Sequence, residues 1–357
     1  MNMKKLFGKI IPLCVLLGAL FSEGIFYLLL RQFLNPFFSI ILALLPFLPF
    51  LIYGAARKQK PGKMRRMCNL IGGALITPAC YFMIFSASAG LFVLFGLPLS
   101  YASDCVWAIL ISCLAVTLAG LYQGTRIQTR RYAVNIPHAM PCKIVLFSDL
   151  HLGDFCTLKQ VERTVKAIEN EKSALILFAG DLVDMDLPTG KKAEQYAKLL
   201  SRLGGIVACE GNHDLHDKDN PARESFLQRA NIRMLCDEST HDPETGLWIS
   251  GRKSRKRQRL TANALAKKGA DILLEHDPKT VEEALPCGYG LILCGHTHRG
   301  QTFPGNILRR LTCRYYYGMN NEGDTTVITT GGCGSTALPL RLGIPPEIVV
   351  ITVENDK

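Results

Sequence analysis

The stretch LILCGHTHRGQ, residues 291–301, decides the fold of this chain. Its four apolar residues end at Gly295, a pattern typical of a buried strand that enters a turn. Two histidines, His296 and His298, then follow one residue apart. In an extended segment alternate side chains share a face, so the pair can chelate a metal ion, although histidines in turns are often only solvated. The rest of the chain has to decide between these interpretations.

From Pro141 onward the sequence alternates short apolar runs with amphipathic segments. Strands that alternate with helices predict an α/β domain, and in α/β sheets ligands bind at the carboxyl ends of the strands. Five successive predicted strands end in Asp, His or Asn, which places polar residues at that edge. We expect strands at 143–148, 174–179, 205–210, 271–276, 291–294 and 325–330, and helices at 157–172 and 191–203.

The polar residues at these strand ends supply two carboxylates, one amide oxygen and four imidazoles. This donor set is too large for one tetrahedral zinc ion, and it contains no thiolate. It suits two ions of intermediate hardness, Mn²⁺, Fe or Zn²⁺, and one carboxylate has to bridge them because adjacent cations repel each other. The donors are Asp149, His151, Asp181, Asn212, His276, His296 and His298, with His213 set aside.

The same residues form five blocks that resemble the signature of the calcineurin-like metallophosphoesterase family. The resemblance covers residues 142–353 and implies a four-layer α-β-β-α sandwich. The chain's last segments, at 314–318 and 338–348, resemble a bacterial subgroup that is often tethered to membranes. The five blocks are Asp-x-His at 149–151, Gly-Asp-x-x-Asp at 180–184, Gly-Asn-His-Asp at 211–214, His276, and Gly-His-x-His at 295–298.

The resemblance also implies a role for each site residue. Two cations would acidify a shared water molecule, and the resulting hydroxide would attack phosphorus in line. His213 would donate a proton to the leaving oxygen, and Asp214 would orient that imidazole. From its place in the chain, we expect Asp184 to support the loop or to contact a ligand from behind, and not to bind metal itself. The first ion would be held by Asp149, His151, Asp181 and His298, and the second by Asp181, Asn212, His276 and His296.

The first 131 residues differ in composition from the rest. They contain 13 Lys or Arg and two acids, Glu23 and Asp104, whereas residues 132–357 hold 28 bases and 28 acids. A uniformly basic nucleic-acid-binding protein is therefore excluded. Apolar stretches close to the length of a spanning helix instead predict a four-helix transmembrane module. They lie at about 11–30, 37–53, 68–95 and 106–122.

The basic residues lie in alternate loops, which predicts the orientation of the chain. The N-terminus, the loop after the second span and the segment after Arg131 should all face the cytoplasm. Thirteen cysteines without a C-x-x-C pair fit reduced thiols on that side of the membrane. We therefore expect a multi-pass protein of the cell membrane with a transmembrane module at 1–131, a linker at 132–141 and a cytoplasmic catalytic domain at 142–353.

Two further features have open interpretations. Glu23 is the only acid inside a predicted span, and we expect it in helix packing or at the lipid interface. The segment GRKSRKRQRL at 251–260 contains six bases where the family usually has an acidic or neutral turn. It is either a solvated, mobile loop or a segment that contacts anionic lipid headgroups or steers a polyanionic substrate.

These observations predict a membrane-anchored phosphoesterase that hydrolyses a phosphodiester or pyrophosphate bond. The resemblance makes a lipid-linked substrate such as UDP-diacylglucosamine one expectation. A soluble nucleotide or a phosphoprotein is the alternative substrate, and a non-catalytic membrane module is the alternative class of protein. The expected partners are the phosphorylated or lipid-linked substrate and membrane lipids, with no specific nucleic acid.

Overall fold

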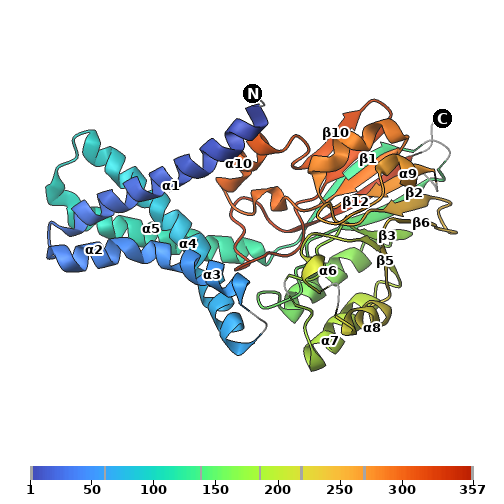
Figure 1. Cartoon of the computed structure of the whole chain (residues 1–357), viewed down its shortest axis with the longest axis horizontal. Coiled ribbons are helices and arrows are strands. Elements are labelled where there is room, and N and C mark those ends of the chain that lie inside the picture. Colours follow the sequence, from blue (N-terminus) through green and yellow to red (C-terminus); the bar gives the residue numbers. More distant parts are fainter. Residues whose placement is uncertain are drawn as a thin grey trace. The chain divides into compact units, whose positions relative to one another are not determined.

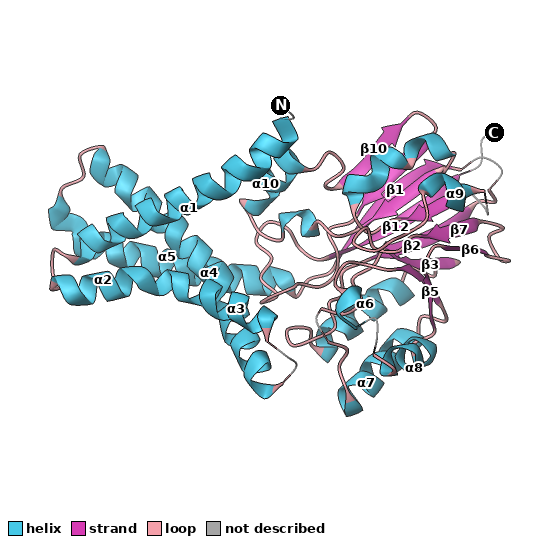
Figure 2. Cartoon of the chain, viewed as in Figure 1, coloured by secondary structure: helices cyan, strands magenta, loops and turns pink. Residues whose placement is uncertain are grey.

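The computed structural model describes residues 3–59, 62–136, 139–184, 186–217, 220–267 and 271–354, with side chains described from residue 16 onward. The chain divides into two compact units, Met1–Tyr122 and Gln123–Lys357 (Figure 1). The first unit is helical, and the second contains all of the described strands (Figure 2).

The helical unit is built from long apolar helices. Among the described residues, three helical segments are long and apolar enough to cross a membrane: Pro36–Lys58, Lys63–Leu94 and Leu99–Gly124. They overlap the spans predicted at 37–53, 68–95 and 106–122. The helices are α1 (Met3–Leu30), α2 (Pro36–Leu44), α3 (Leu48–Lys58), α4 (Lys63–Leu94) and α5 (Ala102–Gly124), with 3₁₀ turns η1 (Leu45–Phe47) and η2 (Leu99–Tyr101).

The first predicted span, 11–30, lies within α1. The part of this span with described side chains, Leu16–Leu30, is apolar but shorter than the other three segments. Glu23, inside this part, is buried, and neither carboxylate oxygen forms a hydrogen bond with a described residue. Its side chain is therefore packed among the helices of this unit. Helix packing is one of the two environments that we expected from the sequence, the other being the lipid interface.

The second unit contains two six-stranded sheets, so the predicted α/β class is confirmed. The first sheet has the order β1-β12-β2-β3-β4-β5, and the second has the order β10-β11-β9-β8-β7-β6. The strands of the first sheet are β1 (Gln128–Asn135), β2 (Cys142–Phe147), β3 (Leu175–Phe178), β4 (Ile206–Cys209), β5 (Ile232–Leu235) and β12 (Glu347–Glu354). Those of the second are β6 (Glu238–His241), β7 (Trp248–Gly251), β8 (Ile272–Leu274), β9 (Leu291–Cys294), β10 (Gly318–Glu322) and β11 (Thr325–Thr329).

Helices and 3₁₀ turns connect these strands. The helix α6 begins after Thr157, whose side chain accepts a hydrogen bond from the backbone N–H of Gln160 as an N-cap. The helices are α6 (Leu158–Glu169), α7 (Gly190–Ser201), α8 (Ala222–Arg229), α9 (Ala262–Ala266) and α10 (Gly305–Thr312). The 3₁₀ turns are η3 (Asp214–Asp217), η4 (Pro278–Glu283), η5 (Leu285–Cys287) and η6 (His298–Gly300).

Strand periodicity divides the apolar side chains among three buried clusters. In β2, Ile144 and Leu146 join one cluster with side chains of the second sheet, such as Leu293. The alternate residues of β2, Val145 and Phe147, point to the other face and pack with α6, α7 and α8. A third cluster lies between the second sheet and α9. The apolar runs therefore face other layers on both sides, which explains why they lack polar alternation.

The predicted linker at 132–141 is wrong in its first half. Strand β1 runs to Asn135 and pairs in parallel with β12 along its whole length. Only Val134 of this edge strand is buried. Its sequence, QTRRYAVN, therefore lacks the apolar pattern by which a buried strand is recognised.

The basic segment 251–260 is folded into the domain. Arg252 is 2% exposed, and its Nη1 lies 3.0 Å from Glu275 Oε2. Arg259 Nη1 contacts the same oxygen at 3.0 Å, and Arg257 Nη1 lies 2.8 Å from Glu210 Oε1. Arg252 is therefore not part of a solvated loop, although Arg255 and Lys256 are exposed. Carboxylates of the domain already pair with five of the six bases that a headgroup contact would use. The partners are distant in sequence, so no local pattern could reveal them.

Replacing Arg252 by alanine is expected to destabilise the protein by roughly 3 kcal/mol. This is the lower end of the range for breaking a buried ion pair, because Arg259 still contacts Glu275. Thermal unfolding of the full chain in detergent measures the loss. The matched control is Lys256→Ala, since Lys256 is exposed in the same segment and forms no ion pair with a described residue. Equal losses for the two variants would contradict this assignment.

Candidate active site

The polar residues predicted at the strand ends gather at one edge of the two sheets. Strands β2, β3 and β4 are parallel to one another, as are β8 and β9. Their carboxyl ends therefore point in a common direction within each sheet, as in other α/β domains that bind ligands at this edge. The loops that follow carry Asp149, His151, Asp181, Asn212, His276, His296 and His298.

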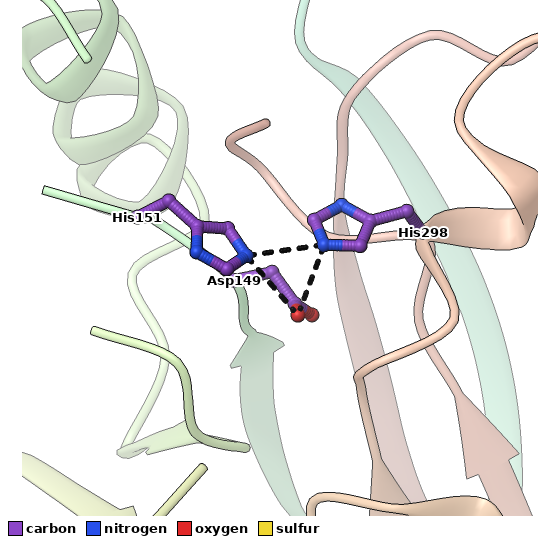
Figure 3. Close-up of side chains that lie close together, drawn as sticks. All are labelled: Asp149, His151 and His298. Atoms are coloured by element: carbon purple, nitrogen blue, oxygen red, sulfur yellow. Dashed lines mark hydrogen bonds and ion pairs between the residues drawn. The ribbon is translucent and has the colours of Figure 1, made fainter. Parts of the chain in front are cut away.

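One group of donors consists of Asp149, His151 and His298 (Figure 3). The Nε2 atoms of the two histidines face each other at 3.1 Å. Asp149 Oδ1 lies 3.4 Å from Nε2 of His298 and 3.7 Å from Nε2 of His151. All three residues are buried. Two imidazole nitrogens and a carboxylate oxygen that converge in this way form a ligand set for a transition-metal ion.

The two oxygens of Asp149 have different surroundings. Oδ2 accepts hydrogen bonds from the backbone N–H of His296, at 3.1 Å, and from the hydroxyl of Ser148. Oδ1 is buried and forms no hydrogen bond with a described residue. A buried acceptor without a partner is uncommon, and a cation would satisfy it. The carboxylate therefore fits a metal site.

A second group consists of Asp181, His276 and His296. His276 Nε2 lies 3.1 Å from Asp181 Oδ2, and its Nδ1 lies 2.6 Å from the carbonyl oxygen of Ala179. Because a carbonyl can only accept, Nδ1 of His276 carries the hydrogen and Nε2 faces the group. The amide oxygen of Asn212 is another buried acceptor that forms no hydrogen bond with a described residue.

Asp181 belongs to the second group and also faces the first. Its Oδ1 accepts a hydrogen bond from the backbone N–H of His213 at 2.7 Å. Its Oδ2 lies 3.1 Å from His276 Nε2 in the second group and 3.9 Å from His151 Nε2 in the first. One oxygen is thus fixed by the backbone while the other faces donors of both groups, which is the arrangement that a bridging ligand needs.

Charges within the site keep both carboxylates ionised. Burial alone would raise the pKa of Asp149, but the imidazoles of His298, His151 and His276 outweigh burial and hold that pKa well below its usual range. Burial would likewise raise the pKa of Asp181, but the charge of His276 outweighs burial and lowers that pKa below its usual value. The carboxylates are therefore in the form that binds cations.

The histidines divide into two kinds. Burial lowers the pKa of His298, and burial together with His276 lowers the pKa of His296 to about 4. Burial therefore favours the neutral form of these two imidazoles, which is the form that carries a lone pair for a metal ion. Burial alone would lower the pKa of His276 as well, but the charge of Asp181 raises it to about 10. A cation that binds His276 therefore has to displace a proton.

The backbone around these donors is strained. Five of the ten described non-glycine residues with positive φ are predicted ligands. Left-handed conformations cost a residue with a Cβ about 1–2 kcal/mol each, and such strain concentrates at functional sites. The five are Asp149 (φ 55°), His151 (φ 48°), Asp181 (φ 59°), His296 (φ 70°) and His298 (φ 48°).

The role predicted for Asp214 is wrong. Its carboxylate accepts hydrogen bonds from the backbone N–H groups of Asp181, Gly211 and Val183, at 3.0, 2.8 and 3.1 Å. It therefore holds the loops together instead of orienting His213. Because Asp214 follows His213 in sequence, we expected their side chains to interact. The carboxylate of Asp214 is instead held by the three backbone donors.

Asp184 is the carboxylate that orients His213. His213 Nδ1 lies 3.0 Å from Asp184 Oδ1 and 2.9 Å from the carbonyl oxygen of the same residue. Burial lowers the pKa of His213, but the hydrogen bond to Asp184 and the charge of Asp181 outweigh it and raise that pKa. His213 also lines a pocket of about 470 Å³ together with His296 and His298.

Arg341 supports the site, and the sequence did not indicate this role. It is 1% exposed, and it donates hydrogen bonds to the carbonyl oxygens of Gly331 at 2.9 Å, His298 at 3.3 Å and Gly334. Its Nη2 also lies 3.2 Å from His298 Nδ1. A single arginine in the apolar segment 338–348 gives no local signal of this kind. Arg341 joins the glycine-rich turn to a predicted metal ligand.

Known proteins are similar to this chain over the domain that carries these donors. The model of the family described as calcineurin-like phosphoesterase matches residues 142–300. A metallophosphoesterase of Helicobacter pylori is 31% identical over 58% of this chain and 59% of its own length. Phosphodiesterase YaeI of Escherichia coli is 30% identical, over 60% of this chain and 83% of its own. A transmembrane protein with a metallophosphoesterase domain from Danio rerio is 28% identical, over 60% and 53%.

The chain therefore belongs to the calcineurin-like phosphoesterase family. It spans about 59% of the length of the Helicobacter pylori relative. Proteins of this family use divalent metal ions, and the two donor groups fit that requirement.

Replacing Gly211 by alanine is expected to reduce metal binding. A Cβ at this position would overlap the carboxylate and backbone nitrogen of Asp181. Because those atoms belong to the packed interior, the carboxylate has to shift, and we expect bound metal to fall by about half or more. Elemental analysis of the purified full chain measures this. The control is Gly205→Ala, where the added atom would meet only Asn231 Nδ2 at 3.7 Å. An unchanged metal content in Gly211→Ala would contradict the placement of Asp181.

Proposed function

We propose that this protein is a membrane-anchored phosphoesterase that uses two divalent transition-metal ions to hydrolyse a phosphodiester or pyrophosphate bond. The observation that carries the proposal is the position of Asp181 Oδ2, which faces His276 of one group and His151 of the other. Mn²⁺, Fe and Zn²⁺ suit these donors. One ion would bind Asp149, His151, Asp181 and His298, and the other Asp181, Asn212, His276 and His296.

The chemistry divides between the ions and the chain. Two such ions, when bound, lower the pKa of a water molecule and draw charge from the phosphoryl oxygens. The chain fixes the donors through backbone hydrogen bonds, as at Asp149 and Asp181. His213, oriented by Asp184 and lining the pocket, is placed to give a proton to the leaving oxygen.

A lipid-linked phosphate is the substrate class that we propose, with UDP-diacylglucosamine as an example. The helical unit supports this proposal, because its three long apolar helices would hold the enzyme at a membrane. The names of two relatives agree with it, one a phosphodiesterase and the other a transmembrane protein. A soluble nucleotide or a phosphoprotein is the alternative substrate.

We propose further that the chain is a multi-pass protein of the cell membrane with its phosphoesterase domain in the cytoplasm. The alternation of basic loops supports this orientation. The apolar segment Leu16–Leu30 supports a fourth span in α1. The three buried clusters, one between the sheets and one on each outer face, support a four-layer α-β-β-α sandwich.

The direct test is Mn²⁺-dependent hydrolysis by the full chain in detergent. Bis-p-nitrophenyl phosphate is compared with UDP-diacylglucosamine in mixed micelles and with soluble nucleotide diesters. We expect metal-dependent hydrolysis of the chromogenic ester and a preference for the lipid-linked substrate. Asn212→Ala is expected to lose about 100-fold in turnover, or ~2.7 kcal/mol, because it removes a ligand of one ion. Asn321→Ala, at an exposed asparagine, is the control. Wild-type rates in Asn212→Ala would contradict the assignment of Asn212 as a ligand of the second ion.

A leaving-group series tests the role of His213. A general acid matters when the leaving oxygen is basic, and it matters little for p-nitrophenolate, which leaves without a proton. We expect His213→Gln to slow an alkyl phosphodiester by about 10²–10⁴-fold and the nitrophenyl ester much less. Asp184→Asn should act in the same direction to a smaller extent. Equal slowing of the two esters would contradict proton donation by His213.

A further inference from the structure

A short helix with two different faces borders the pocket. Helix α10 (Gly305–Thr312) follows the η6 turn that carries His298. Gly305, Leu308, Arg309 and Thr312 line the pocket together with the donors of the site. One face of α10 is therefore part of the candidate active site.

The opposite face of α10 is apolar and exposed. Ile307 and Leu311, four residues apart on the same side of the helix, are 49% and 72% exposed. Phe303, just before the helix, is 52% exposed. Eight large hydrophobic side chains of the described residues 123–354 are exposed, and four of them lie within 303–311. Such a concentration on one surface marks an interaction site.

Positive charge accompanies this apolar face. Arg310 is exposed three residues after Ile307, and neither Arg309 nor Arg310 forms an ion pair with a described residue. Most bases of the segment 251–260 are, in contrast, already paired with carboxylates. Apolar side chains flanked by available arginines complement an anionic leaflet, in which phosphates lie above acyl chains.

The connection between the units favours a leaflet as the occupant of this surface. Helix α5 belongs to the candidate span Leu99–Gly124, and β1 begins at Gln128. The three residues between them, 125–127, reach at most about 11 Å. So short a connection tethers the domain that begins at β1 to the membrane, and a short amphipathic helix on a tethered domain is available to the lipid surface.

We propose that α10 binds the interface of an anionic leaflet, with Phe303, Ile307 and Leu311 among the acyl chains and Arg310 at the headgroup phosphates. The pocket on the other side of the helix then opens beside the headgroup layer. A phosphate ester of a lipid reaches the site without leaving the membrane completely. The second part of this inference rests on the proposed function, whereas the membrane contact of α10 does not.

Fluorescence quenching tests the membrane contact without reference to activity. Trp107 and Trp248 are the two tryptophans of the chain. We introduce Leu311→Trp into the full chain that carries Trp107→Phe and Trp248→Phe, and reconstitute it in nanodiscs of phosphatidylcholine and phosphatidylglycerol. Brominated acyl chains are expected to quench at least half of its emission. The Trp107→Phe chain, in which Trp248 remains, is the control and is expected to stay unquenched.

Two further arms examine charge and substrate entry. Arg310→Glu is expected to halve the quenching of Leu311→Trp in discs that contain phosphatidylglycerol. The double variant Ile307→Ser, Leu311→Ser is expected to hydrolyse a lipid-presented diester about 10-fold more slowly and bis-p-nitrophenyl phosphate at the wild-type rate. Neither residue lines the pocket.

The outcomes separate the two proposals. No more quenching in Leu311→Trp than in the control overturns the membrane contact of α10. Equal slowing of the lipid and soluble esters in the double variant overturns substrate entry along this helix. If the wild-type chain hydrolyses no phosphodiester while Leu311→Trp is quenched, the proposed function fails and the membrane contact stands.

Discussion

The burial of two ionised carboxylates is the constraint on which the second unit depends. Asp149 and Asp181 are 0% and 1% exposed, and a buried charge is costly unless opposite charge and hydrogen bonds compensate it. In both residues the backbone fixes one oxygen by donating an N–H, and imidazoles surround the other. Strand ends from both sheets have to converge to supply these partners. This convergence also supplies the donors of a metal centre.

The surrounding backbone is shaped to permit this convergence. A Cβ on Gly332 would lie 2.8 Å from Cβ of Asp149, so only glycine allows the turn to approach. Arg341 fixes that turn by binding the carbonyl oxygens of Gly331 and His298. The left-handed residues of the site store strain that the packed sheets support. The donors therefore lie in closely packed backbone, whereas α10 on the border of the site has no buried residue and presents an apolar face.

The sequence predicted features that depend on local pattern and missed those that depend on distant contacts. Buried strands such as β2 and β9 appear in the sequence as apolar runs, because each signal lies within a few residues. The edge strand β1 carries no such pattern. The missed features are contacts between residues far apart in the chain. They are the ion pair of Arg252 with Glu275, the hydrogen bonds of Arg341 to the glycine-rich turn, and the contact of Asp184 with His213 in place of Asp214. Spacing along the chain cannot specify contacts of that kind.

The most direct measurement of the centre is electron paramagnetic resonance of the full chain loaded with two equivalents of Mn²⁺. If Asp181 joins both donor groups, the two ions lie roughly 3.5–4 Å apart and are magnetically coupled. We predict the multiline spectrum of a coupled pair, and its loss in Asp181→Asn. A spectrum of isolated Mn²⁺ ions in the wild-type chain at full occupancy would contradict a shared centre.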